Sequence, residues 1–199
     1  MTPDDIRKYW LGDLSPDSPN ASKAQMGLWY GKDEAVDRHI RETFAPHIPL
    51  AIAGEFDAWQ GSPKSAVALI ILMDQFSRNA FRDSPQMYAA DPKALSVSLA
   101  LIETRADKAL HPIERMFVYL PLEHSEDVVY QDRCVELAQE LADEVSDAAR
   151  EGYRGFLNYA VKHRDIIARF GRFPHRNAIL GRVNSEQESA FLTQPGSSF

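Results

Sequence analysis

Hydrophobic residues recur every three to four positions over most of the chain, which is the spacing of one face of a helix. Val36, Ile40 and Phe44 form one such stripe. Residues 66–73 differ, because they are apolar on every side. A helix without a polar face packs in the interior, so we expect the helix that starts after Ser62 to be buried at the centre of the fold.

Prolines and capping residues divide the rest of the chain into further helices. Pro92 and Pro112 stand in first turns, where a missing N–H costs nothing, and Pro121 is expected to end the second of these helices. Ser125 then caps a long helix, and the last long helix starts at about Glu151. No segment alternates between apolar and polar residues as a strand would. The sequence therefore predicts an all-α fold of antiparallel helical hairpins, stacked as a solenoid or arranged as an irregular bundle.

One domain accounts for the whole chain, residues 1–199, because this length suits a single hydrophobic core. Within it we expect an N-terminal helix and loop over residues 1–31 and a flexible tail over residues 194–199. The loop portion, residues 11–25, is rich in proline and polar residues.

Composition places the chain among ordinary globular proteins, since 44% of its residues are hydrophobic and 26% are charged. The apolar run 66–73 is too short to cross a bilayer, and the N-terminus has no signal-peptide pattern. We therefore expect a cytoplasmic protein with no membrane partner. Cys134 has no second cysteine to pair with, and the histidines lack ligand spacing, so no metal and no cofactor are expected.

Charge is unevenly distributed along the chain, whose net charge is -7. Residues 123–151 hold ten acidic side chains against two arginines, whereas residues 163–182 hold five arginines against one aspartate. A globally acidic chain is a poor nucleic-acid binder, because phosphate contact needs a broad basic face. The local basic segment predicts a small anionic ligand instead. The alternative is that the two segments neutralise each other as a structural ion-pair network.

Two polar clusters stand outside the basic segment. Asp74 and Arg78 lie four residues apart at the end of the buried helix and can pair on one face, with Asn79 as a candidate C-cap. Charged groups in that position indicate a cleft or a partner. In the second cluster, Glu123 precedes His124, and a histidine beside a carboxylate can serve in acid–base chemistry. Adjacent turn residues usually point apart, so a solvated His124 is the expected outcome.

The basic segment is the densest cluster, and its turn is shaped by Gly171 and Pro174. Guanidinium groups present planar sets of donors suited to carboxylate or phosphate, which makes this turn a candidate ligand site. His163 falls on the inward face of the last long helix, where a hydrogen-bonded core role is expected. The candidate ligand-binding residues are Arg78, Asn79, Arg169, Arg172, His175, Arg176 and Asn177.

Three motifs in this order resemble a bacterial domain-of-unknown-function family, number 924. They are residues 73–79 (MDQFSRN), 119–126 (YLPLEHSE) and 163–177, which end in RFGRFPHRN. One departure is Ser77, where the family pattern often has proline. The resemblance covers nearly the whole chain and implies a tetratricopeptide-like all-helical fold. It implies no activity, because the family has none assigned.

Three functions remain open at this point. The first is a helical protein that binds a small phosphate- or carboxylate-bearing ligand in an arginine-rich pocket. The second is a hydrolase-like enzyme that uses Glu123 with His124 or His175 beside that pocket. The third is a protein–protein interaction module of the tetratricopeptide-like type, with tryptophans as anchors in an exposed groove.

Overall fold

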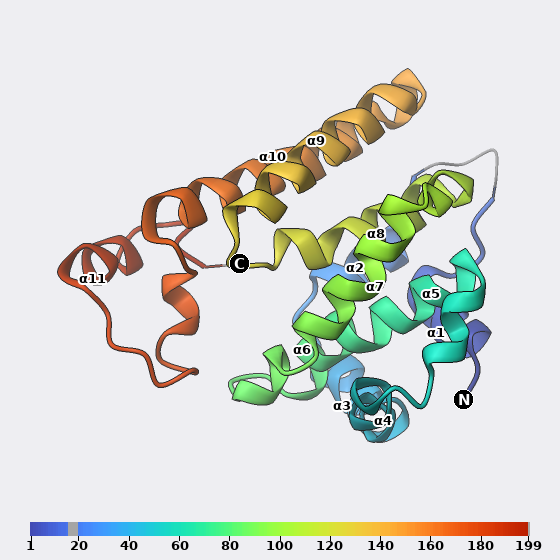
Figure 1. Ribbon diagram of the computed structural model, residues 1–199, viewed down its shortest axis with the longest axis horizontal. Helices are drawn as coiled ribbons and strands as arrows, with labels where there is room; N and C mark the ends of the chain where they lie inside the picture. Colours follow the sequence, from blue (N-terminus) through green and yellow to red (C-terminus); the bar gives the residue numbers. More distant parts are fainter. Residues whose placement is uncertain (16–19, 199) are drawn as a thin grey trace.

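The computed structural model describes residues 1–15 and 20–198, and over these residues it is helical and contains no strand. This confirms the all-α prediction. Residues 16–19 of the predicted loop and residue 199 of the predicted tail lie outside the described residues. The helices (Figure 1) are α1 (Pro3–Leu11), α2 (Lys23–Tyr30), α3 (Glu34–Thr43), α4 (Ile48–Ala53), α5 (Pro63–Ile70), α6 (Phe76–Ala80), α7 (Asp91–Glu103), α8 (Pro112–Glu123), α9 (Val128–Glu144), α10 (Asp147–Phe170) and α11 (Glu186–Leu192).

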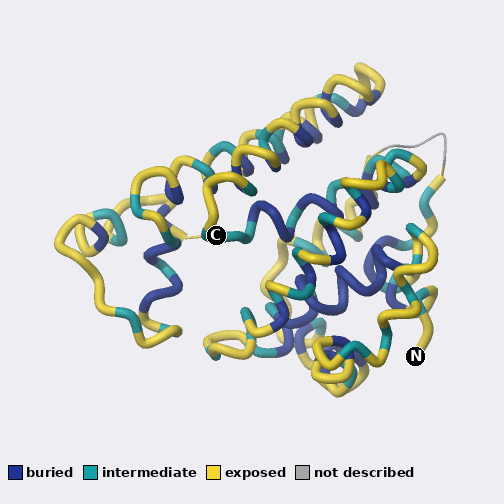
Figure 2. The backbone as a smooth tube through the Cα atoms, in the orientation of Figure 1, coloured by how far each residue is buried: buried dark blue, intermediate teal, exposed yellow. Residues whose placement is uncertain are grey.

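Helix α5 lies at the centre of the core, as its apolar sequence predicts. Every residue from 66 to 73 is buried. Helices α1, α7 and α8 pack around α5, and Figure 2 shows the buried backbone concentrated there. Because all sides of this helix meet apolar neighbours, its C-terminal end carries polar groups into the interior rather than into solvent.

Helices α9 and α10 form a long antiparallel hairpin that packs on α8 (Figure 1). Only Val145 and Ser146 join the two helices, and short connections of this kind produce antiparallel neighbours. After α10, Gly171 adopts a left-handed conformation with φ of 68° and turns the chain into the basic segment. The single hairpin fits the predicted arrangement, while its repetition as a solenoid stays a prediction.

Three helix boundaries differ from the sequence-based predictions. Pro121 lies inside α8 and does not end it: the proline removes one backbone donor, but the N–H of His124 still bonds to the carbonyl of Leu120 at 2.9 Å. Asp127, rather than Ser125, caps α9. Helix α10 begins at Asp147, one turn earlier than expected. The extension of α8 matters most, because it holds Glu123 in regular helix.

Two further features bear on the site. The Trp10 side chain is buried in the core, and the indole N–H of Trp29 donates to the carbonyl of Trp10 at 2.9 Å. At the other end of the chain, Ser197 is buried and Ser198 lines a cavity between the helices. Within residues 1–15 and 20–198, no helix is both long and apolar enough to cross a membrane.

Candidate functional site

A cavity of about 450 Å³ opens where α2, α8 and α10 meet the C-terminal end of the buried helix. Aromatic and aliphatic side chains from α2, α8 and α10 form much of its wall. Concave sites of this size with a few convergent polar groups are typical of small-molecule binding. The polar and ionisable side chains in the lining include Gln75, Arg78, Glu123, His124 and His163.

Asp74 reaches this site because the buried helix widens into a π-turn over Ile71–Gln75. The hydroxyl of Ser77 donates to the carbonyl of Met73 inside the widened turn. Such π-turns are frequent at functional sites, since one extra residue re-aims the side chains that follow. The carboxylate of Asp74 is fully buried.

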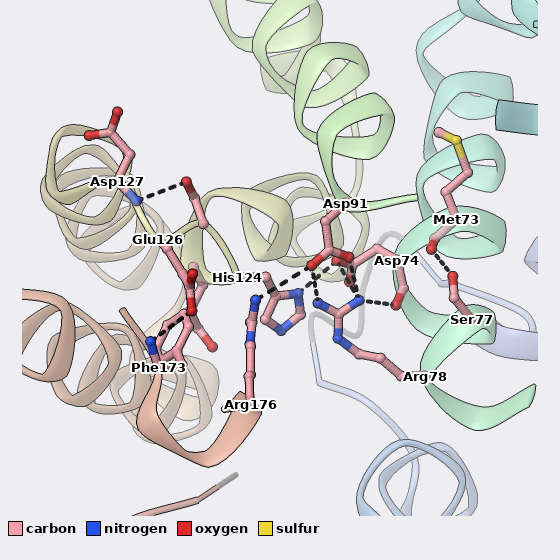
Figure 3. Close-up of polar contacts among 12 residues, drawn as sticks. Met73, Asp74, Ser77, Arg78, Asp91, His124, Glu126, Asp127, Phe173 and Arg176 are labelled. Atoms are coloured by element: carbon pink, nitrogen blue, oxygen red, sulfur yellow. Dashed lines mark hydrogen bonds and ion pairs between the residues drawn. The ribbon is translucent and has the colours of Figure 1, made fainter. Parts of the chain in front are cut away.

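The carboxylate of Asp74 holds the imidazole of His124. Its Oδ1 atom lies 2.7 Å from Nδ1 of His124 (Figure 3). Burial acts to raise the pKa of Asp74, but Arg78 and His124 outweigh it and keep that pKa below its usual range. An ionised carboxylate can only accept, so Nδ1 carries the proton and Nε2 of a neutral ring keeps its lone pair.

His124 is neutral at neutral pH. Burial lowers its pKa, and the nearby Arg78 guanidinium lowers it further, while the attraction of Asp74 opposes both only in part. The expectation of a solvated His124 is therefore wrong. The side chain is 14% exposed, because the end of α8 faces the π-turn rather than solvent.

The pKa of Glu123 is raised, whereas that of His124 is lowered. Its side chain is 5% exposed, and burial together with the charge of Asp74 raises its pKa to about 8. Its Oε1 lies 3.4 Å from Nδ1 of His163, but that nitrogen is closer to the Tyr159 carbonyl, at 2.9 Å. Its Oε2 is buried without a hydrogen-bond partner in the described chain. Glu123 is thus a protonated acid at neutral pH.

Burial keeps His163 uncharged as well, lowering its pKa to about 3. Its side chain faces inward from α10, as predicted, and is 6% exposed. Because the His163 ring is neutral, it supplies no positive charge that would favour loss of the Glu123 proton.

Arg78 pairs with two carboxylates rather than standing free. Its NH1 and NH2 groups donate to Asp91 at 3.0 and 3.1 Å, and NH1 lies 3.3 Å from Oδ1 of Asp74. This confirms the predicted pairing of Asp74 and Arg78. Arg176 approaches the same Asp91 at 3.7 Å (Figure 3). Its guanidinium carbon lies 4.6 Å from the ring centroid of Tyr88 and 4.4 Å from that of Phe173. Burial, together with repulsion from Arg78, lowers the pKa of Arg176 to about 10.

The remaining arginines of the basic segment face acids and aromatic rings. Arg172 donates to Glu188 at 2.6 and 2.8 Å, and Arg182 donates to Glu126 at 2.6 and 2.9 Å. The Arg169 guanidinium lies 4.6 Å from the ring centroid of Phe170. These contacts favour the ion-pair network that the sequence left open as the alternative to an anion site.

The other predicted site residues lie outside the cavity lining. The Asn79 amide donates to Asp37 at 2.8 Å and does not cap the helix, which ends one residue later. The Asn177 amide donates to Asn184 at 2.7 Å. Burial lowers the pKa of His175 to about 4, and its ring packs 5.5 Å from that of Phe173.

Sequence reasoning missed the contact between Asp74 and His124, which are 50 positions apart. The signal in the sequence was a carboxylate at the end of an apolar helix. Sequence reasoning also missed the roles of Asp91 and Tyr88, whose partners come from distant segments. Across the part of the chain that the structure describes, no three His, Cys, Asp or Glu side chains cluster as a metal site requires.

Comparison with known proteins gives the family but no activity. No curated protein matches the chain. A solved structure, the protein of unknown function ATU0120 from Agrobacterium tumefaciens, is 36% identical, with 96% of each chain covered and a TM-score of 0.78. The family model described as a bacterial protein of unknown function (DUF924) matches residues 6–196. The chain therefore belongs to the DUF924 family.

Proposed function

We propose that this protein is an enzyme that hydrolyses a small, uncharged substrate by general acid–base catalysis in the cavity, with His124 as the base and Glu123 as the acid. One observation carries the proposal: the Asp74-held imidazole and a buried, protonated carboxyl line the same cavity. Two titratable groups whose environments push their pKa values apart are the usual mark of an acid–base pair.

The base half of the proposal rests on the contact of Asp74 with His124. A carboxylate bonded to Nδ1 fixes the ring and its tautomer and stabilises the imidazolium that forms when Nε2 takes a proton. Asp74 is a positioning residue, because it acts through His124. The lowered pKa of His124 keeps the base unprotonated and ready at neutral pH.

The acid half rests on Glu123. With a pKa of about 8 the carboxyl keeps its proton at neutral pH, and Oε2 is buried without a partner among the described residues. In the proposed reaction, water attacks the substrate's carbonyl carbon as His124 removes its proton. The bond to the leaving group then breaks, and the Glu123 proton goes to that group. Proton transfer from His124 to the Glu123 carboxylate restores both residues.

An uncharged substrate follows from the charge balance. Arg78 lines the cavity, but Asp74 and Asp91 both contact its guanidinium. The local charge therefore does not favour a strongly anionic ligand. Arg78 is the observation that supports the second candidate, a protein that binds a small anionic ligand without chemistry, since its guanidinium is the one arginine group in the lining among the described residues.

The test is a hydrolysis screen with p-nitrophenyl esters and p-nitroanilides of small acyl groups. We expect wild-type turnover, and a fall in kcat/KM of about 10²-fold or more in His124→Gln and in Glu123→Gln. Asp74→Asn should displace the acid limb of the pH profile while leaving KM nearly unchanged. His39→Gln is the matched control, because His39 is exposed and lies outside the lining set.

Two outcomes overturn the proposal. One is a wild-type protein that hydrolyses no member of the panel. The other is hydrolysis that persists at the wild-type rate in a folded His124→Gln variant. Thermal-shift stabilisation by inorganic phosphate or acetate, lost in Arg78→Lys, would support the anion-binding candidate instead.

A further inference from the structure

We propose that a second, apolar cavity beside the first receives an aryl or alkyl group of the substrate, so that the substrate is amphipathic. This inference rests on the proposed function and names its substrate class. The second cavity, here called the annex, has a volume of about 240 Å³ and lies between α2, α8 and α10.

The annex and the site cavity share a wall. Trp29, Tyr30, Met116 and Phe156 line both cavities. The two cavities are therefore adjacent, and the proposed ligand extends from one to the other past these four side chains. Its polar group would lie toward Glu123 and His124, which line only the site cavity.

The lining of the annex selects an apolar group. The described residues that line it include no Asp, Glu, Lys, Arg or His, and most of them are aliphatic or aromatic. An apolar cavity of about 150 Å³ holds a benzene ring, so about 240 Å³ leaves room for a ring with a short linker.

Two side chains that line the annex are partly exposed to solvent. Met26 is 46% exposed and Tyr30 is 64% exposed, although both side chains line it. A ligand that covers these two side chains removes their apolar area from water, which favours binding.

Gly152 creates part of the space. It lies within the 24-residue helix α10 and lines the annex. Glycine inside a helix is destabilising relative to alanine, so a packing or functional reason is expected. Among the described residues, a Cβ atom there would meet only Asn20 Oδ1 at 3.8 Å, an ordinary contact. Leucine at this position should therefore enter the annex without disturbing the helix.

The test compares Gly152→Leu with Gly155→Leu. Gly155 lies on the same helix and lines neither cavity, and a Cβ atom added to it would meet no described atom within 4 Å. Both changes add helix propensity, so both variants should melt at or above the wild-type temperature. The probes are 4-phenylbutyramide and butyramide, whose binding is measured by calorimetry, and the p-nitrophenyl esters of the matching acids.

We expect the wild type to bind 4-phenylbutyramide at least tenfold more tightly than butyramide. Gly152→Leu should abolish this preference and leave butyramide binding unchanged, whereas Gly155→Leu should behave as the wild type. Loss of the preference in both variants, or in neither, overturns the inference. Equal binding of the two amides by the wild type also overturns it.

The failure of this inference can be told from the failure of the proposed function. If His124→Gln abolishes hydrolysis but the wild type shows no phenyl preference, the annex assignment alone is wrong. If the phenyl preference exists and disappears in Gly152→Leu, but no ester is hydrolysed, the annex is a binding pocket and the acid–base function is wrong.

Discussion

The basic segment and the wall of the site cavity use charged residues in opposite ways. In the basic segment, Arg172 pairs with Glu188 and Arg182 pairs with Glu126, so these two arginines each have an acidic counterpart. In the cavity wall, burial and the charge of Asp74 make Glu123 keep its proton instead. Balanced pairs hold segments together, whereas an unbalanced buried carboxyl has a perturbed pKa, which is the property that catalysis needs.

This comparison shows that the density of charge in the sequence is a poor guide to the site. The segment with five arginines forms mainly ion pairs and aromatic contacts. The candidate chemistry lies with two adjacent residues of ordinary appearance, Glu123 and His124, and with a partner 50 positions away. The following predictions test this contrast.

The largest effect should come from Glu123→Gln. Activity should fall by about 10²-fold or more. The stability difference should change with pH: the folded-state pKa of about 8 lies above the ordinary value of 4.5, so the wild type loses stability as pH rises from 4.5 through 8. Denaturant melts should show that the free energy of unfolding of the variant, relative to that of the wild type, is higher at pH 9 than at pH 5. A constant difference at both pH values would contradict the buried, protonated carboxyl.

Glu126→Gln should damage stability without affecting chemistry. Its carboxylate accepts two bonds from Arg182 and one from the backbone N–H of Phe173 at 2.8 Å. Loss of one partner from such a part-buried pair costs about 2 kcal/mol. Denaturant melts should show this loss while kcat/KM stays at the wild-type value. A variant with wild-type stability but no activity would indicate that the functional site lies at the basic segment.

Acid should destabilise the fold through His163. Its folded-state pKa of about 3 lies below the ordinary value of 6.5, so stability is fully present above pH 6.5 and is lost as pH falls toward 3. One such group contributes about 1.4 kcal/mol per pH unit within that window. Melts from pH 7 to pH 4 should show a smaller slope in His163→Gln. An unchanged slope would assign the acid sensitivity to other groups.

Arg172→Ala should give the smallest effect. The Arg172 side chain is 32% exposed, so solvent screens its pair with Glu188, and the backbone N–H of Ser185 still donates to that carboxylate at 2.7 Å when the guanidinium is removed. Thermal melts should show a small decrease that shrinks in high salt, and ester hydrolysis should be unchanged. A loss of activity in a variant that melts normally would restore the basic segment as the functional site.

Much of the fold could be predicted from local pattern. The apolar run 66–73 identified the central helix, and the spacing of Asp74 and Arg78 identified their pair. Local rules failed where tertiary packing decides, as at Pro121, which packing keeps inside α8. The failure at His124 has the same cause, since only the folded chain brings Asp74 against it.

The residues that contact the basic segment also could not be predicted from the sequence. Sequence shows that Arg176 and Asn177 are polar groups in a rigid turn, but not which groups face them. Their surroundings come from α7, from the turn before it and from the loop before α11. Contacts between distant segments depend on how the helices pack, and a single sequence carries no direct record of that packing.

The π-turn over Ile71–Gln75 has a consequence for comparing relatives. A regular α-helix rotates about 100° per residue, so deleting one residue here would restore regular spacing and turn Arg78 away from Asp91. The deletion would leave a regular α-helix. In an alignment of this family, a one-residue gap at this point would therefore separate members that keep the proposed acid–base site from members that retain only the scaffold.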